Sequence, residues 1–272
     1  PFAQGSDGGG SVRIPASLCH LYGFKPSLSL LGNLHGRVNK LGLSVIGPLS
    51  HHVEDAAAML DALRGHSHCH LDRFEATCLS RCRQPPVRLR IRMSCESPLG
   101  VIEPEIVEAV ERTARTLEDL GHHVEPVAMV HADLEEFMPL WQLMLAAVPW
   151  FGDVGLQPVT RWLRQAGRRL DLEKVKEQQR LLTARQLDLL GDADVILTAT
   201  VPVSPPRVGE YRELGPAETF ARISHLGALT APFNISRAPA ATIPVGLSSR
   251  GLPIGVQIGS RPDNDHLILS LS

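Results

Sequence analysis

The alternation of helical and extended patterns along the chain predicts an α/β fold, because such alternation is typical of a sheet covered by helices. The 272 residues are 43% hydrophobic and 21% charged, a composition that can bury a globular core. No run of eighteen or more apolar residues occurs, which excludes a transmembrane helix within this sequence. We find no internal repeat, so a repeat architecture is excluded as well.

The first half of the chain predicts two amphipathic helices. Residues 53–63 carry apolar side chains at helical spacing, with Ser50 expected to cap the start and Gly65 to end the helix. Residues 104–120 repeat the pattern and stop at Gly121. A short strand is expected at 124–127, directly after this helix.

The second half predicts three further helices and three strands. The helices are expected at residues 133–147, 171–190 and 266–271, the last one cut short by the end of the sequence. Short β-rich runs that end near proline or glycine indicate the strands, which are expected at residues 195–197, 241–245 and 254–258.

A glycine-rich segment, residues 5–16, carries the clearest chemical signal in the sequence. It places Gly8, Gly9 and Gly10 directly before Ser11, and a charged residue stands on each side of this group, Asp7 and Arg13. Glycines leave their backbone N–H groups uncovered, so these amides can point at an oxygen that becomes negative during acyl transfer. The segment therefore predicts a serine nucleophile beside an oxyanion hole.

A linker, a phosphate-binding loop and a nucleophile elbow all fit this segment less well. A flexible linker would not lead straight into the apolar run between Val12 and Phe24. A phosphate-binding loop would need the GK[ST] ending or the G-x-G-x-x-G spacing, and neither occurs. The nucleophile elbow G-x-S-x-G also fails, since Val12 and Arg13 follow Ser11.

The segment resembles the hallmark of the amidase signature family, Gly-Thr/Ser-Asp-x-Gly-Gly-Ser-[hydrophobe]-Arg-[hydrophobe]-Pro-Ala. Further blocks in the family's order support the resemblance: residues 23–27, 36–38, 47–50, 53–63, 194–202, 232–235 and 251–257. The Asp7–Gly10 version, together with residues 150–152 and 160–163, is most similar to the bacterial branch that contains 6-aminohexanoate cyclic-dimer hydrolases.

The resemblance implies a mixed β-sheet between helical layers, with residues 1–272 as the downstream part of a single amidase domain that is incomplete at its N-terminus. Members of the family use a Ser-Ser-Lys triad, and carry-over gives Ser11 as nucleophile and the amides of Gly8, Gly9, Gly10 and Ser11 as the oxyanion region. The lysine base and the cis-serine lie upstream of this block in the family, so both are expected outside residues 1–272.

The other residues near the nucleophile receive supporting roles or none. Asp7 and Arg13 are expected to pair and hold the loop in shape. No lysine of the sequence is expected to replace the missing base; the four are Lys25, Lys40, Lys174 and Lys176. The sequence contains twelve histidines, so a Ser-His-Asp triad stays open as an alternative. His20 and His35 are the histidines nearest to Ser11 in sequence.

The resemblance implies hydrolysis of a small-molecule amide through an acyl-enzyme, with no metal or organic cofactor, in the cytoplasm, and it leaves room for a homodimer. A net charge of −2 and few aromatic residues do not indicate a nucleic-acid partner or a membrane surface. Five cysteines, an odd number, point weakly to a reducing compartment. Two alternatives stay open: a catalytically incomplete amidase-like remnant, and a protein similar to the A subunit of glutamine-dependent amidotransferases.

One further region and one set of residues carry no catalytic motif. Residues 64–95 hold seven arginines and a His66-x-His68-Cys69-His70 cluster whose cysteine spacing matches no standard zinc pattern, so we expect an arginine-rich surface loop. The second set is Asn234 with the aromatic residues Trp141, Trp150, Phe151 and Trp162, which either shape the acyl pocket or belong to the core.

Overall fold

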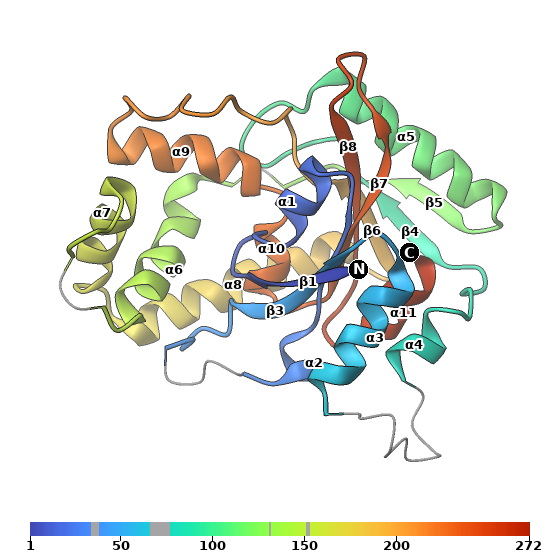
Figure 1. Cartoon of the computed structure of the whole chain (residues 1–272), viewed down its shortest axis with the longest axis horizontal. Coiled ribbons are helices and arrows are strands. Elements are labelled where there is room, and N and C mark those ends of the chain that lie inside the picture. The colour runs from blue at the N-terminus through green and yellow to red at the C-terminus, as the bar shows by residue number, and fades with distance from the viewer. Residues whose placement is uncertain (34–37, 66–76, 131, 151–152) are drawn as a thin grey trace.

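One mixed sheet organises the protein. The computed structural model describes residues 1–33, 38–65, 77–130, 132–150 and 153–272 (Figure 1). Eight strands pair in the order β1-β3-β2-β7-β8-β6-β4-β5. β4 pairs in parallel with β5 and β6, and the other neighbours are antiparallel. The strands are β1 Phe2–Asp7, β2 Tyr22–Lys25, β3 Val45–Ser50, β4 Arg90–Met93, β5 His123–Pro126, β6 Val195–Ala199, β7 Ala240–Leu247 and β8 Pro253–Gly259.

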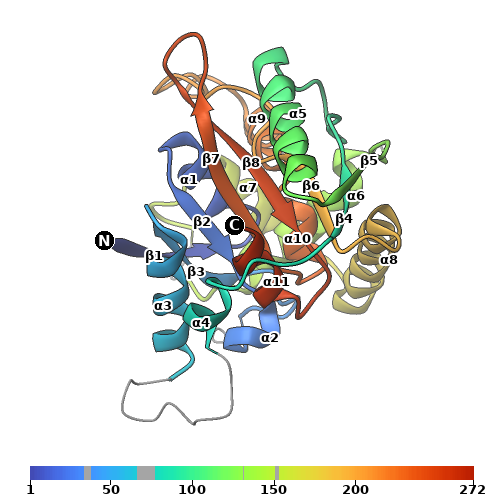
Figure 2. The same cartoon turned by 90° about the vertical axis from the view of Figure 1, so that its right-hand side faces the viewer.

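Helices cover both faces of this sheet. On one face lie α3 (Val53–Leu63), α5 (Pro104–Asp119) and α11 (Asp265–Leu271), which stand in front of the strands in Figure 2. The opposite face is covered by α1 (Arg13–Leu18), α8 (Leu172–Leu190) and α10 (Ala231–Ile235). Because side chains alternate along a strand, the sheet supplies apolar residues to both layers. The predicted α/β fold with a mixed sheet between helical layers is therefore confirmed.

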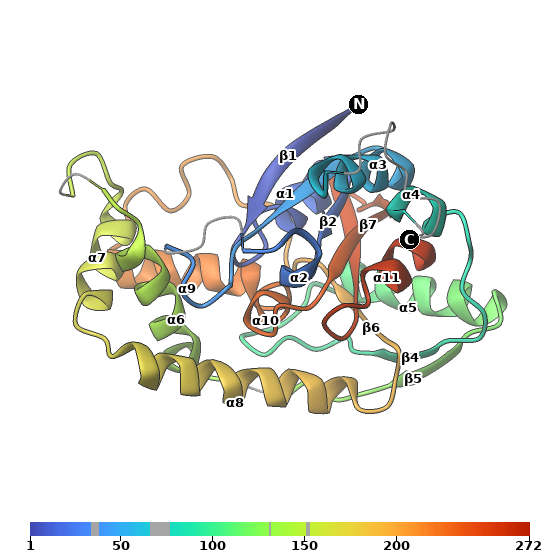
Figure 3. The same ribbon diagram turned by 90° about the horizontal axis from the view of Figure 1, so that it is seen from below.

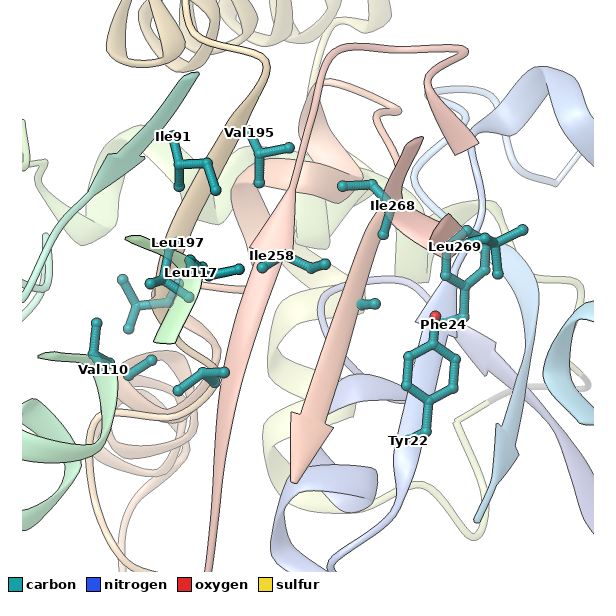
Figure 4. Packing of buried hydrophobic residues seen from close by; sticks show 14 of the residues in the cluster. Tyr22, Phe24, Ile91, Val110, Leu117, Val195, Leu197, Ile258, Ile268 and Leu269 are labelled. Carbon is teal, nitrogen blue, oxygen red and sulfur yellow. The ribbon is translucent and has the colours of Figure 1, made fainter. Parts of the chain in front are cut away.

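The main core lies between the sheet and the α3, α5 and α11 layer. Phe24, Ile91, Leu197 and Ile258 are fully or almost fully buried there, from four different strands (Figure 4). Burial of such a side chain contributes roughly 1.5–3 kcal/mol. Ile196 points to the other face, where it packs with Leu189 and Leu190 of α8.

Three helices form a lobe beside the sheet, which we call the helical lobe: α6 (Leu134–Ala147), α7 (Pro158–Gly167) and α9 (Pro216–Gly227). Figure 3 shows α8 running from this lobe along the underside of the sheet. Leu140 and Leu143 of α6 pack with Leu41, Leu43 and Ile235, which join the lobe to the sheet side. Short helices complete the described chain, α2 (Leu28–Leu31) and α4 (Cys78–Arg81).

The long predicted helices and the predicted strands are confirmed, with shifts of a few residues at their ends. Gly65 follows α3 with a φ of 80°, and its N–H bonds to the carbonyl of Ala62, as expected of a helix stop. The prediction that Ser50 caps α3 is wrong. Ser50 ends β3 and donates its hydroxyl to the carbonyl of His52, which occupies the N-cap position.

The expectation of a surface loop across residues 64–95 is also wrong for part of that region. Residues Arg90–Met93 form β4 inside the sheet, and Ile91 is fully buried between two arginines that stay partly exposed. Cys78–Arg81 form α4, whose first N–H groups bond to the carboxylate of Asp61. The His66–His70 cluster lies outside the described residues. Arginines alternate with apolar residues in Arg90–Met93, so this stretch resembled the arginine-rich loop around it and the strand was not predicted.

Candidate active site

The nucleophile loop joins the first strand to the first helix. β1 ends at Asp7, where it pairs with Val45 of β3, and α1 begins at Arg13. The intervening residues, Gly8–Val12, turn the chain sharply enough that Ser11 is exposed while its neighbours Val12 and Arg13 are fully buried. The predicted nucleophile is therefore exposed to solvent, on a loop that is held between β1 and α1.

A buried ion pair connects the two ends of this loop. The Arg13 guanidinium grips the Asp7 carboxylate with two hydrogen bonds, from Nε to Oδ2 and from Nη2 to Oδ1, each 3.0 Å long. Both side chains are fully buried. A bidentate pair of this kind fixes orientation as well as distance. The geometry agrees with the scaffold role expected of Asp7 and Arg13.

Residues from distant parts of the chain form the remaining hydrogen bonds of the two charged side chains. Arg13 Nη2 donates to Asn234 Oδ1 and Nη1 donates to Gln257 Oε1, both at 2.7 Å. Asn234 returns a bond from Nδ2 to Asp7 Oδ1 at 2.9 Å. A buried charge left without partners is costly, whereas a fully bonded network holds one geometry.

The charge state of Asp7 follows from this environment. Burial disfavours the ionised carboxyl, but the Arg13 charge and its hydrogen bonds outweigh that penalty and lower the pKa of Asp7 to about 2. The carboxylate is therefore ionised at neutral pH, so it has no proton to donate, and a group with so low a pKa is a weak base. Asp7 is suited to hold the loop and not to act as an acid or base.

The Asp7 carboxylate also bonds to the loop backbone. Its Oδ1 accepts the N–H of Gly10 at 2.7 Å and its Oδ2 accepts that of Val12 at 3.3 Å. Gly10 was expected to offer a free amide to an oxyanion, and here that amide already has an acceptor. Within the described part of the chain, no acceptor bonds to the N–H groups of Gly8, Gly9 or Ser11. All three residues line the cavity described below.

Gly10 instead has a steric role in the loop. Its φ of 123° favours glycine, and a Cβ built there would lie 2.2 Å from Thr230 Oγ1. The Thr230 hydroxyl donates to the carbonyl of Gly9 at 2.7 Å. Thr230 therefore closes on the loop from behind and fixes the orientation of the Gly9 carbonyl.

A cavity of about 360 Å³ opens beside Ser11. It is bordered by Gly8, Gly9 and Ser11 on one side and by side chains of α6 and α9 on the other. This volume is at the small end of the roughly 300–1,000 Å³ typical of small-molecule sites. A larger groove of about 870 Å³ lies elsewhere, between α2 and α8, and Ser11 does not line it. We take the smaller cavity as the candidate site because Ser11, the predicted nucleophile, lines it.

Asn234 and the four aromatic residues that were expected either to shape the acyl pocket or to belong to the core have different positions. Trp141 lines the cavity. Trp162 packs against Phe220 of the cavity wall with ring centroids 6.2 Å apart, and Trp150 is 52% exposed. Phe151 lies outside the described residues. Asn234 is not among the described lining residues, since it is buried in the network beneath the loop.

The lysines show different environments. Lys25 is fully buried in β2, and its ammonium donates to the carbonyl of Pro26 at 2.8 Å. Burial, reinforced by the Arg13 charge, lowers the pKa of Lys25 to about 7. Lys40 and Lys174 are exposed, and Lys176 pairs with Glu173. No lysine or histidine is among the described residues that line the cavity.

No group of three or more His, Cys, Asp or Glu side chains that could hold a metal occurs among the residues with described positions. His20 is exposed and has a φ of 57°, and His35 lies outside the described residues.

Among the residues that the structure describes, no helix is both long and apolar enough to cross a membrane.

Thr230 and Gln257 were not predicted from the sequence. Thr230 bonds to Gly9 of the loop and Gln257 bonds to Arg13, across separations of 221 and 244 positions. One signal was present in the sequence: Thr198, Thr242 and Gln257 are polar residues within otherwise apolar strands. All three are buried on the face that α1 covers. Buried polar residues of this kind need partners, so they mark a polar network within the core.

Comparison with known proteins gives consistent matches over the whole chain. An amidase family model matches residues 1–269. A candidate amidase of Synechocystis sp. is 31% identical over 281 residues, which cover all of this chain and 54% of the relative. The chain thus spans about half the length of that relative.

Two solved structures share the fold. A 6-aminohexanoate cyclic dimer hydrolase in complex with substrate superposes with a TM-score of 0.78 at 24% identity, covering 100% of this chain and 63% of that one. A bacterial aryl acylamidase of the amidase signature enzymes superposes with a TM-score of 0.80 at 23% identity, covering 100% and 61%. At these identities the likeness shows the fold alone.

Proposed function

The chain belongs to the amidase family, and we propose that it supplies the nucleophile, Ser11, and the acyl-binding cavity of an enzyme that hydrolyses a small-molecule amide. The observation that carries the proposal is the placement of Ser11 at a cavity, next to three amides that bond to no acceptor in the described part of the chain. Neither alternative raised from the sequence, an inactive remnant or an amidotransferase subunit, is favoured by the matches.

In the proposed reaction, Ser11 Oγ attacks the carbonyl carbon of the amide and its proton passes to a base. The carbonyl oxygen becomes an oxyanion, which accepts hydrogen bonds from the amides of Gly8, Gly9 and Ser11. The C–N bond then breaks as the nitrogen takes up a proton, and an acyl-Ser11 ester remains. Water hydrolyses the ester, releasing the acid and restoring the hydroxyl.

The loop is suited to this reaction because its donors are already oriented. Donors that need no reorganisation stabilise the transition state most, and removal of one donor from such a hole costs roughly 3–4 kcal/mol of barrier. Here the buried Asp7–Arg13 pair and Thr230 hold the loop before substrate arrives. We propose Gly10 as part of this support, since its amide bonds to Asp7.

The base in this proposal is the lysine that the family resemblance implies, acting through a cis-serine, both from outside residues 1–272. Lys25 is a poor candidate in spite of its lowered pKa, because it is buried in β2 and its ammonium donates to Pro26. We further propose a cytoplasmic location, supported by the free thiols of the described cysteines, Cys19, Cys78, Cys82 and Cys95. A homodimer stays a prediction from the family resemblance.

The test of the proposed function compares two serines of the same cavity. Protein carrying Ser11→Ala is expected to release no amine from small amides, while Ser224→Ala, which changes the other lining serine, keeps most of the activity of the unchanged protein. Amine release is measured by a fluorogenic assay of the liberated amine, and circular dichroism checks the fold of both variants. Turnover that survives Ser11→Ala would contradict the proposal.

A further inference from the structure

The described walls of the cavity beside Ser11 carry no charge. Apart from Ser11, Ser224 and three glycines, every described lining residue has an apolar side chain, and none is Asp, Glu, Lys, Arg or His. The largest of these side chains come from two helices of the lobe. They are Phe137, Trp141 and Met144 from α6 and Phe220 from α9.

We propose that this cavity selects an uncharged, apolar acyl group and that Trp141 sets how far that group extends beside the nucleophile. The inference rests on the proposed function in one respect, that Ser11 is the atom next to which the acyl group lies. It goes further in assigning the chemical class of the substrate and the residue that limits its size.

Trp141 is assigned this role because it lies directly against the nucleophile loop. A Cβ added to Gly9 would stand 3.1 Å from Trp141 Nε1, and one added to Gly8 would stand 3.4 Å from Met144 Sδ. The two side chains are three positions apart on α6 and therefore share one face of the helix. Together they form the wall that adjoins the proposed oxyanion donors.

The position of Trp141 is fixed by the packing behind it. The indole packs against the cluster of Leu41, Leu43, Leu140, Leu143 and Ile235, which come from α6, from α10 and from the segment before β3. A wall held in this way does not yield easily to a longer substrate, because well-packed interiors resist added volume.

Charge discrimination follows from the same lining. A carboxylate or ammonium on the acyl chain would lose its water without gaining a partner from the described lining, which is strongly unfavourable. Each methylene of a neutral chain instead gains about fourfold in affinity while room remains. The cavity of about 360 Å³ limits that gain to a short chain or a single ring.

The experiment measures binding and needs no turnover. Protein with Ser11→Ala is titrated by NMR with acetamide, butyramide and hexanamide, and with two charged amides of matched length, succinamate and 6-aminohexanamide. We expect affinity to rise about fourfold per methylene and then level off. The charged amides are expected to bind at least tenfold more weakly than their neutral counterparts. Equal binding of charged and neutral amides would overturn the proposed selectivity.

The variants test Trp141 itself. In the same background, Trp141→Ala is expected to move the levelling point to longer chains, whereas Trp150→Ala, an exposed tryptophan outside the cavity, leaves it unchanged. Trp141→Phe gives a smaller shift in the same direction and serves if the alanine variant fails to fold. Identical chain-length profiles for the Trp141 and Trp150 variants would overturn the assignment. Since binding is measured without Ser11, these outcomes are independent of the test of the nucleophile.

Discussion

The Asp7–Arg13 pair is the residue-scale feature on which the nucleophile loop depends most. Both side chains are fully buried, and Asp7 bonds to the loop backbone while Arg13 bonds to Asn234 and Gln257. Removing one member of a buried pair leaves the other charge without compensation. Loop geometry and protein stability are therefore linked at this point.

This link predicts a large cost for Asp7→Ala. We expect a loss of about 3–5 kcal/mol in the free energy of unfolding, because the Arg13 charge stays buried without its partner. The matched control is Glu177→Ala, which breaks an exposed pair with Arg180 and should cost at most about 1 kcal/mol. Urea unfolding followed by circular dichroism measures both. Similar costs for the two variants would show that the buried pair does not anchor the fold.

Lys25 predicts a pH dependence of stability. Burial and the Arg13 charge lower its pKa in the folded protein to about 7, against 10.5 as the ordinary value. Between these values the unfolded chain binds more protons than the folded protein, so stability rises with pH across this window. Below about pH 7 both states are protonated and the slope vanishes.

The measurement compares the unchanged protein with Lys25→Met from about pH 6 to about pH 10, a window that spans the lowered pKa. Relative to the variant, the unchanged protein should gain stability as the pH rises above about 7. The difference between the two urea-unfolding profiles isolates Lys25, since other titrating groups are common to both. Parallel profiles would contradict the lowered pKa.

At the residue scale the sequence supported part of the site. Ser11, Asp7 and Arg13 lie within a few positions of one another, so one local motif and its family resemblance were enough to predict all three as site residues. The remaining members of the network approach from α10 and β8, and no local pattern shows which distant residue meets a loop. Gly10 illustrates the same limit, because the acceptor of its amide depends on the turn that the loop makes.

At the scale of elements, the close approach of backbones decides which residues are tolerated. A Cβ at Gly167 of α7 would stand 1.9 Å from the carbonyl oxygen of Gln142 in α6. The two helices of the lobe therefore cross at a glycine, and this contact keeps α6 in place behind the cavity.

The crossing predicts that Gly167→Ala separates α6 from α7. We expect a destabilisation of about 1–3 kcal/mol from the forced overlap. Gly215→Ala is the matched control, because no atom lies within 4 Å of a Cβ at that position; its effect should stay within about 0.5 kcal/mol. Thermal unfolding compares the pair, and equal midpoints would count against a tight crossing.

The elements that the sequence predicted well are those with an uninterrupted pattern. α5 shows apolar residues on one face along 16 positions, and β6 and β8 are mostly apolar. The strands β1, β2 and β3 were not predicted because glycine and proline interrupt their patterns. Gly47 explains the interruption, since a Cβ there would stand 2.1 Å from the carbonyl oxygen of Phe24. Sheet packing demands glycine at a position where strand propensity disfavours it.

At the scale of the molecule, the helical lobe packs on elements that lie between it and the sheet. Leu41 and Leu43, which precede β3, and Ile235 of α10 pack with Leu140 and Leu143 of α6. A lobe that depends on such contacts should not unfold separately from the sheet. The three tryptophans, Trp141, Trp150 and Trp162, all lie in the α6–α7 region, so their fluorescence reports mainly on the lobe.

This packing predicts one unfolding transition for the helical lobe and the sheet. Urea denaturation followed by tryptophan fluorescence should coincide with that followed by circular dichroism. Ile258 lies in β8 and not in the region that holds the tryptophans. Ile258→Ala is expected to lower the free energy of unfolding by about 2–5 kcal/mol and to move both curves together. A fluorescence curve that stays in place while the circular dichroism curve moves would show that the lobe unfolds on its own.

Covalent labelling tests most directly whether the fold presents Ser11 as the nucleophile of an amidase. Protein that includes the segment proposed to carry the lysine base and the cis-serine is treated with an alkyl fluorophosphonate, digested, and mapped by mass spectrometry, alongside its Ser11→Ala and Ser224→Ala variants. We expect one phosphonyl group per chain, on Ser11, in the unchanged protein and in Ser224→Ala, and no label in Ser11→Ala. Labelling of Ser224 or of another serine in place of Ser11, or no labelling at all, would contradict this role of Ser11.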